Sequence, residues 1–161
     1  MTQTDIKRIT KIKLNEADFL KRSSEIELER HRALSDLLAE NSFDVQKDNM
    51  FGPYHLELNL IERHLHFQTL CTQTQNISII EIPLSPFKKI VRDYFMICEV
   101  FYDTAKKGLH SKLEAIDMAR RGLHDEGAEI LRKHIKNKIT LDKQTSRRLF
   151  TLICILHIRI L

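Results

Sequence analysis

Glycine is scarce in this chain, with 4 among 161 residues, where average usage of about 7% would give roughly 11. So few glycines argue against the glycine-rich loops that cradle phosphates, and they predict few loops altogether. Gly122 and Gly127 have the spacing of a phosphate-binding P-loop, but Ala128 and Glu129 stand where that motif needs Lys and then Ser or Thr. We therefore exclude a P-loop. Because a glycine inside a helix costs about 1 kcal/mol relative to alanine, we expect both glycines to mark a close contact with another helix or a ligand.

Paired cysteines and long apolar runs are also missing. Cys71, Cys98 and Cys154 are isolated and odd in number, and no signal segment opens the chain, which is typical of a reducing cytoplasm. The most apolar stretch, residues 149–161, is shorter than the about 20 residues of a membrane span and is interrupted by His157. We expect a soluble cytoplasmic protein without a membrane span, whose C-terminal stretch forms a buried core helix.

The common catalytic and metal-binding fingerprints are absent as well. There is no Gly-x-Ser-x-Gly, no His-Glu-x-x-His and no dinucleotide-binding motif. His64 and His66, with His55 across a predicted hairpin, suggest a metal, but no nearby Cys or second carboxylate completes four ligands. We expect solvated strand residues at these positions, with no metal and no cofactor.

Apolar residues make up 42% of the chain, which at this length suffices for one domain with its own core. We expect a single domain over residues 1–161, with a sheet-forming part and one helix in residues 1–84 and a helical part in residues 85–161. The first part carries 10 Lys+Arg and 13 Asp+Glu, a net −3, and the second carries 16 and 9, a net +7. An anionic partner fits the second part, although its interspersed acids favour an ordinary solvated helical surface.

Apolar and polar residues alternate in the first part, as in strands with one buried face. The clearest case is a hairpin with a tight connection at Glu62-Arg63, and its predicted register pairs Leu60 with Leu65, Leu58 with Phe67 and Leu56 with Thr69. Further strands are predicted over residues 6–14, 43–46 and 77–84, the last with Ile77, Ile79 and Ile82 competing for the core.

Two pairs of residues have the spacing of a capping box, in which each side chain satisfies the free backbone amide of the other. Ser24 with Glu27 predicts a helix that ends near Asn41, and Ser111 with Glu114 predicts a helix through Asn137.

Two further helices complete the pattern. Ser85-Pro86 is a strong helix start, and Gly108 can close that helix in the left-handed conformation. Its run over residues 94–98 is apolar nearly all round, which predicts the central buried helix. A last helix opens at Asp142.

Together these elements predict an α+β fold, with a small, mostly antiparallel sheet of about four strands packed against about four helices, three of them C-terminal.

Residues 116–127 form the densest group of reactive side chains. At about 100° per residue, one side of a helix carries the polar members of this segment, Asp117, Arg120, Arg121, His124 and Asp125, opposite Ile116, Ala119, Leu123 and Ile130. A solvated face with pairs four residues apart is the simplest interpretation, and a buried structural network is another.

The functional interpretation of the same segment is an anion site. Arg120 and Arg121, with Asp117 beside them, are the candidate ligand-binding residues, because guanidinium groups bind phosphate or carboxylate. His124 and Glu126 are the candidate catalytic acid or base.

Several segments together resemble a known family: residues 85–87, 93–98, 116–127 and 147–152. The chain resembles the alphaproteobacterial uncharacterised protein family 0262 over nearly its full length, including residues 40–43, residues 52–54 and the hairpin. This resemblance implies a bacterial cytoplasmic protein, and it implies no activity, because the family has none assigned.

Two functional hypotheses follow from the sequence. The first is a non-enzymatic binding or regulatory module, oligomeric, whose basic helical half or exposed sheet face meets an anionic partner, a protein partner or a second copy of itself. The alternative is a small enzyme that acts on a phosphate- or carboxylate-bearing metabolite through Arg120, Arg121, His124 and Glu126. The missing catalytic motifs favour the first.

Overall fold

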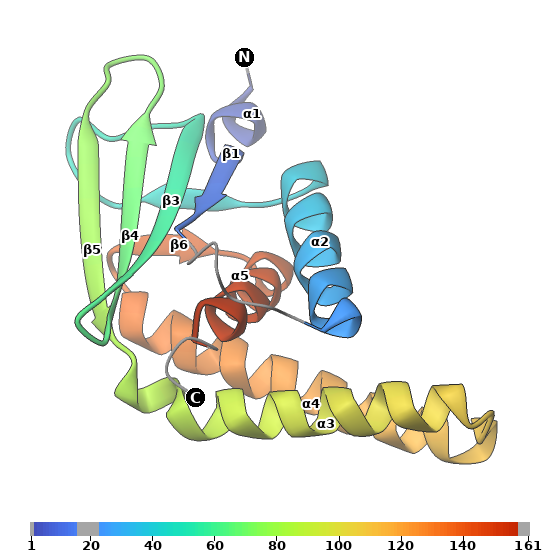
Figure 1. Ribbon diagram of the computed structural model, residues 1–161. Helices are drawn as coiled ribbons and strands as arrows, with labels where there is room; N and C mark the ends of the chain where they lie inside the picture. The colour runs from blue at the N-terminus through green and yellow to red at the C-terminus, as the bar shows by residue number, and fades with distance from the viewer. Residues whose placement is uncertain (1, 16–22, 158–161) are drawn as a thin grey trace.

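The computed structural model describes residues 2–15 and 23–157 (Figure 1). Its elements are α1 (Gln3–Ile6), β1 (Ile9–Leu14), α2 (Ser24–Ala39), β2 (Phe43–Val45), β3 (Tyr54–Ile61), β4 (His64–Cys71), β5 (Ile77–Pro83), a 3-10 turn (Ser85–Phe87), α3 (Lys88–Lys106), α4 (His110–Ile135), β6 (Ile139–Leu141) and α5 (Lys143–His157). The predicted α+β class is therefore confirmed.

The main sheet has the strand order β1-β3-β4-β5. The hairpin of β3 and β4 has the predicted register, with Leu60 opposite Leu65, Leu58 opposite Phe67 and Leu56 opposite Thr69. The rest of the sheet is antiparallel, but β1 runs parallel to β3. A second sheet joins β2, which lies within the strand predicted over residues 43–46, to β6. The sequence did not predict β6, because three residues are too few for a period to be recognised.

Two strand predictions need correction. The strand expected over residues 6–14 begins at Ile9, because Ile6 ends the short helix α1. In β5 the buried residues are Ile80 and Ile82, whereas Ile77 and Ile79 are more than half exposed. The antiparallel register places Ile80 opposite Phe67 and Ile82 opposite Leu65, so the core face of β4 decides which isoleucines of β5 are buried.

The helix starts also differ from the predicted caps. Ser23, and not Ser24, caps α2, because its side chain accepts a hydrogen bond from the amide of Ile26. Helix α4 begins after Leu109 with no side-chain cap, so the capping box predicted at Ser111 is wrong. Two signals are confirmed. Gly108 has a φ of +67° at the end of α3, and Asp142 accepts a hydrogen bond from the amide of Thr145 at the start of α5.

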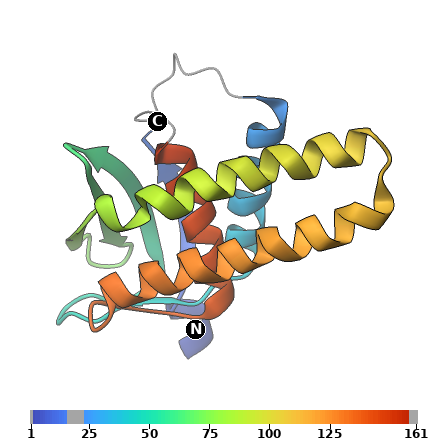
Figure 2. The same cartoon turned by 90° about the horizontal axis from the view of Figure 1, so that it is seen from below.

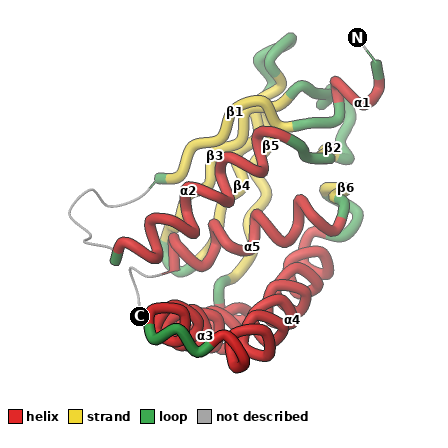
Figure 3. The backbone as a smooth tube through the Cα atoms, turned by 90° about the vertical axis from the view of Figure 1, so that its right-hand side faces the viewer, coloured by secondary structure: helices red, strands yellow, loops and turns green. Residues whose placement is uncertain are grey.

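The central buried helix is α5 and not α3. Its residues 149–157 are all buried, whereas Met96 in the run of α3 that predicted burial is 60% exposed. Figures 1 and 3 show the reason, since α5 lies between the sheet and the antiparallel pair of α3 and α4, with α2 along its side. The extension of this apolar stretch to residues 158–161 lies outside the described residues.

Gly127 explains how closely α4 approaches α5. A Cβ atom at this position would collide with the ring of Phe150, which belongs to α5. The predicted close contact is therefore confirmed at Gly127. At Gly122, apart from its chain neighbours and the backbone of its own helix, no atom of the described residues lies within 4 Å of such a Cβ. Among the described helices, none combines the length and the apolar character needed to cross a membrane.

Candidate anion site

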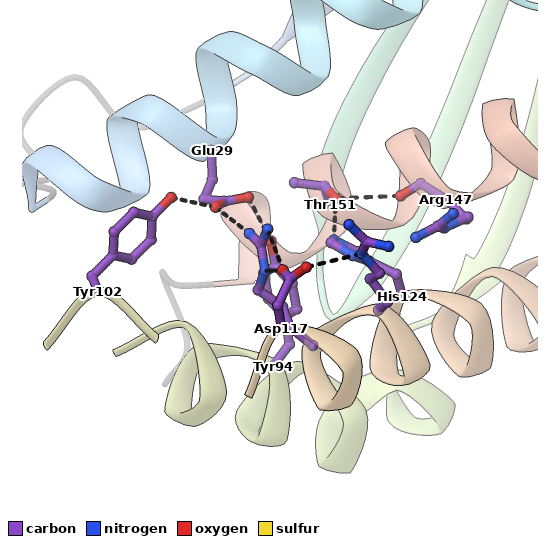
Figure 4. A network of polar contacts seen from close by, with 9 residues as sticks. Glu29, Tyr94, Tyr102, Asp117, His124, Arg147 and Thr151 are labelled. Carbon is purple, nitrogen blue, oxygen red and sulfur yellow. Dashed lines mark hydrogen bonds and ion pairs between the residues drawn. The ribbon is translucent and has the colours of Figure 1, made fainter. Parts of the chain in front are cut away.

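Glu29 is the centre of a polar network between α2, α3 and α4 (Figure 4). Its carboxylate accepts hydrogen bonds from the hydroxyl of Tyr94 at 3.0 Å and from that of Tyr102 at 2.5 Å. The guanidinium of Arg120 donates to the same carboxylate at 2.7 Å. Glu29 is 8% exposed, and burying a carboxylate is costly unless a cation and hydrogen-bond donors replace water. Here Arg120 supplies the cation, and Tyr94 and Tyr102 supply the hydrogen-bond donors.

The guanidinium of Arg120 contacts two carboxylates and one aromatic ring. Besides Glu29, its guanidinium contacts Asp117 at 3.2 Å and lies 4.6 Å from the centre of the Phe101 ring. Asp117 also pairs with Arg121 at 3.0 Å, but the Arg121 side chain is 69% exposed. The polar face predicted for this helix is therefore not simply solvated, because Arg120 points inward and forms part of a buried network.

His124 lies one turn beyond Arg120, with its ring 5.0 Å from that of Tyr94. Its Nε2 atom is 3.2 Å from the hydroxyl of Thr151, which also donates to the carbonyl of Arg147. Burial, followed by the charges of Arg120 and Arg147, lowers the pKa of His124 to about 4. The imidazole is therefore neutral at physiological pH.

A cleft of about 230 Å³ opens beside His124 and Arg120, where α2, α4 and α5 meet. It is lined by Glu29, Arg32, Ala33 and Asp36 of α2, by Arg120 and His124 of α4, and by Gln144, Arg147, Arg148 and Thr151 of α5. The α5 residues are spaced by three and four positions, so they lie on one side of the helix. We call this cleft, with its ten lining residues, the arginine cleft.

The arginine cleft has more positive than negative groups in its lining, with four arginines against two carboxylates. Arg147 pairs with Asp125 at 3.3 Å, and one Nη atom of Arg148 donates to the carbonyl of Glu40 at 3.0 Å. Arg32 is exposed and makes no ion pair within residues 2–15 and 23–157. Several N–H donors are therefore left for an anion.

The structure brings together only some of the residues predicted from the sequence. Arg120 and His124 line the arginine cleft, and Asp117 holds Arg120 from behind. Arg121 points to solvent, and Glu126 lies on a separate hollow beside β6. The reason is the helix period, since Arg121 and Glu126 point away from the side of α4 that faces α5.

Sequence reasoning missed the other eight lining residues, which are Glu29, Arg32, Ala33 and Asp36 of α2 and Gln144, Arg147, Arg148 and Thr151 of α5. In α5 only Thr151 gave a signal, as a polar residue within the apolar run of residues 149–156, because residues 143–148 are all polar. Arg32 had no such signal, because only the packing of α2 against α5 places it there.

A larger hollow of about 740 Å³ lies on the other side of Glu29, toward Tyr94, Phe95 and Ile155. Among the described residues that line it, Lys106 is the only cation, and its ammonium group is 2.7 Å from the carboxylate of Glu25. This hollow therefore offers an anion no free cation.

Residues 6–159 match the sequence model of the family described as "Uncharacterised protein family (UPF0262)". The chain belongs to this family. It is 46% identical to a UPF0262 protein of Paramagnetospirillum magneticum over 152 residues, which cover 94% of this chain and 96% of that protein. It is 43% identical to a UPF0262 protein of Brucella anthropi over 153 residues, with 94% of each chain covered.

These relatives confirm the family that the sequence motifs indicated. The UPF0262 family has no assigned activity, so the comparisons leave the chemistry of the arginine cleft to physical argument. No solved structure matches the chain.

Proposed function

We propose that this UPF0262 protein is a binding module for a small anion that carries a phosphate or carboxylate group and that occupies the arginine cleft. The observation that carries the proposal is the convergence of Arg32, Arg147 and Arg148 from two helices on one space, with Gln144 and Thr151 as neutral hydrogen-bonding groups. Guanidinium groups bind such anions with paired N–H donors.

The size of the arginine cleft supports a small ligand. Its volume of about 230 Å³ lies below the roughly 300–1,000 Å³ that drug-sized ligands occupy. The carboxylates of Glu29 and Asp36 at its α2 side disfavour a second anionic group there. We therefore propose a single anionic group with a small body.

Calorimetric titration with sulfate and with inorganic phosphate, at constant ionic strength, tests this proposal. We expect saturable binding that weakens at least about tenfold in Arg148→Gln and in Arg32→Gln, because each change removes a charge-assisted donor. Arg121→Gln is the matched control, since it removes the same charge from a side chain outside the cleft. Equal weakening in the control would show non-specific attraction to a basic protein and would overturn the proposal.

The pH dependence of sulfate binding gives a second, independent test. Sulfate keeps its charge between pH 4 and 8, so only the protein titrates in the relevant range. A bound anion beside His124 favours the imidazolium form and raises the pKa of His124 from about 4. Sulfate should therefore bind more tightly as the pH falls toward 4, and His124→Gln should remove most of this dependence.

The enzymatic alternative stays a hypothesis with weaker support. Its two candidate acid or base residues, His124 and Glu126, face different parts of the surface.

The three cysteines are free and buried, which supports our proposal that the protein resides in the cytoplasm.

A further inference from the structure

The outer face of the α3–α4 pair exposes large apolar side chains. Met96 and Val100 of α3 are 60% and 47% exposed, and Met118 of α4 is 67% exposed. At about 100° per residue, Met96 and Val100 share one face of α3. In Figure 2 the two helices lie side by side in front of the molecule, with no described element over them. Large apolar side chains exposed on neighbouring helices are typical of an interaction site.

The matching face of α4 carries small residues. Ala115, Ala119 and Gly122 are exposed, and the helix period places them opposite the side of α4 that carries His124. This outer face is therefore separate from the arginine cleft, and what binds there is independent of the proposed anion site.

Two contacts give the register between the antiparallel helices. The rings of Tyr94 and His124 are 5.0 Å apart, and the guanidinium of Arg120 lies over Phe101. Met96 of α3 is therefore level with Gly122 of α4. By the same register Val100 is level with Ala119, and Arg92 is level with Glu126. Large residues on α3 thus stand beside small residues on α4, and a cation stands beside an anion.

Gly122 has no role within the described chain that would compensate its cost. A glycine in a helix interior costs about 1 kcal/mol relative to alanine. Gly127 is required because a Cβ would collide with Phe150, whereas a Cβ at Gly122 would meet open space. A second chain that approaches α4 closely at this point would explain the glycine.

We propose that the outer face of α3 and α4 binds a second copy of this chain, with α3 of each copy lying along α4 of the other. A two-fold axis parallel to the helices produces this arrangement. It places Met96 over Gly122 of the second copy and Val100 over Ala119 of the second copy, so large side chains fill the space above small ones. The same axis brings Arg92 to Glu126 of the second copy, twice in each dimer.

The charged residues on this face support a second copy of the chain as its partner. Arg92 and Glu126 are both exposed, and neither has an ion-pair partner among the residues that the structure describes. A surface whose cations and anions match each other under its own two-fold rotation is complementary to itself.

The size of the face is also sufficient. A helix of the length of α3 is about 28 Å long, and two adjacent helices are about 20 Å wide, so the face measures roughly 560 Å² per copy. A dimer would bury about 1,100 Å² in total, which exceeds the about 1,000 Å² expected of a specific interface.

Sedimentation velocity on the purified full chain, at roughly 10 to 100 µM, tests the proposal. We expect a dimer for the natural sequence and at least about tenfold weaker association for Arg92→Glu and for Glu126→Arg, because each change places like charges together twice. Lys11→Glu on β1 is the control, since Lys11 is exposed on the sheet, and it should leave the dimer unchanged. Thermal unfolding of each variant checks that the exposed substitutions leave the fold intact.

Mixing the two weakened variants is the decisive experiment. A dimer of one Arg92→Glu chain and one Glu126→Arg chain restores both ion pairs in the proposed geometry, so association should return on mixing. A monomeric natural protein over the whole concentration range overturns the proposal. A dimer that neither charge reversal weakens overturns it as well, because the copies would then meet through another face.

Discussion

The Glu29 network and the arginine cleft share Glu29 and Arg120 but differ in how the charges of their other members are balanced. In the network, the carboxylate of Glu29 meets Arg120 and two tyrosine hydroxyls, and Arg120 meets Asp117 in addition. In the cleft, Arg32 and Arg148 lack a carboxylate partner among the described residues. A network whose charges satisfy each other holds helices together, whereas a group with spare donors is prepared for a ligand. The following changes test this division.

The largest effect is expected for Arg120→Met, which leaves Glu29 buried without its cation. We expect a loss of about 3–5 kcal/mol in the free energy of unfolding, measured by urea denaturation. The double variant Glu29→Gln with Arg120→Met should recover part of that loss, because no buried charge then remains unpaired. Arg121→Met is the control and should stay within about 0.5 kcal/mol, because its pair with Asp117 is exposed. A similar loss in the control would contradict a structural role specific to Arg120.

The next largest effect is the dependence of the free energy of unfolding on pH through His124. Its pKa is about 4 in the folded protein, against 6.5 for the free side chain, so between these values only the unfolded chain binds the proton. Protonation therefore favours unfolding, and stability should fall as the pH drops from about 6.5 to 4, by at most about 3 kcal/mol.

The measurement compares urea unfolding of the natural protein and of His124→Gln at several pH values. The variant should show a weaker pH dependence in this window. The pKa of His157 is also lowered by burial, but His157 is present in both proteins, so its contribution cancels in the difference. Parallel curves for the two proteins would show that His124 is not held neutral by the fold.

A smaller loss is expected for Tyr102→Phe, which removes one hydrogen bond to Glu29 and no charge. The cost should be about 1.5 kcal/mol, as for a hydrogen bond to a charged group. Combined with Glu29→Gln, the cost of Tyr102→Phe should shrink, because the acceptor is then neutral. Additive losses would mean that the hydroxyl of Tyr102 stabilises the protein independently of the Glu29 carboxylate.

The smallest effect on stability is expected in the arginine cleft. Arg148→Gln should change the free energy of unfolding by less than about 0.5 kcal/mol, although it should weaken sulfate binding at least tenfold. Thermal unfolding with and without sulfate measures both, since a bound anion raises the unfolding temperature only where it binds the folded protein. If the variant loses stability but its unfolding temperature still rises with sulfate, Arg148 stabilises the fold and does not bind the anion.

Much of the fold could be predicted from local patterns. The hairpin register was predictable because Leu58 and Phe67 alternate with polar neighbours on both strands. Gly108 and Asp142 marked a helix end and a helix start through backbone chemistry that acts over a few residues. The burial of Ile80 in place of Ile79 was not predictable, because it depends on the strand beside it.

The candidate site was only half predictable for the same reason. Asp117, Arg120 and His124 stood out because they lie close together in the sequence. Arg32 and Arg148 reach the cleft from helices that are distant in the chain, and only the packing of α2 and α4 on either side of α5 brings them to one place.

By itself, the sequence determined the family, the α+β class, the hairpin register and the group of reactive side chains on α4, since each can be recognised from motifs and periods that are local in the chain. Tertiary structure alone decided that α5 is the central helix, that Arg120 is enclosed by Glu29 and that the remaining arginines share a cleft. Tertiary structure also gave the two glycines of α4 different surroundings. Gly127 meets Phe150 and Gly122 meets open space, a difference set by the neighbours of each side of the helix and invisible in the spacing of the residues.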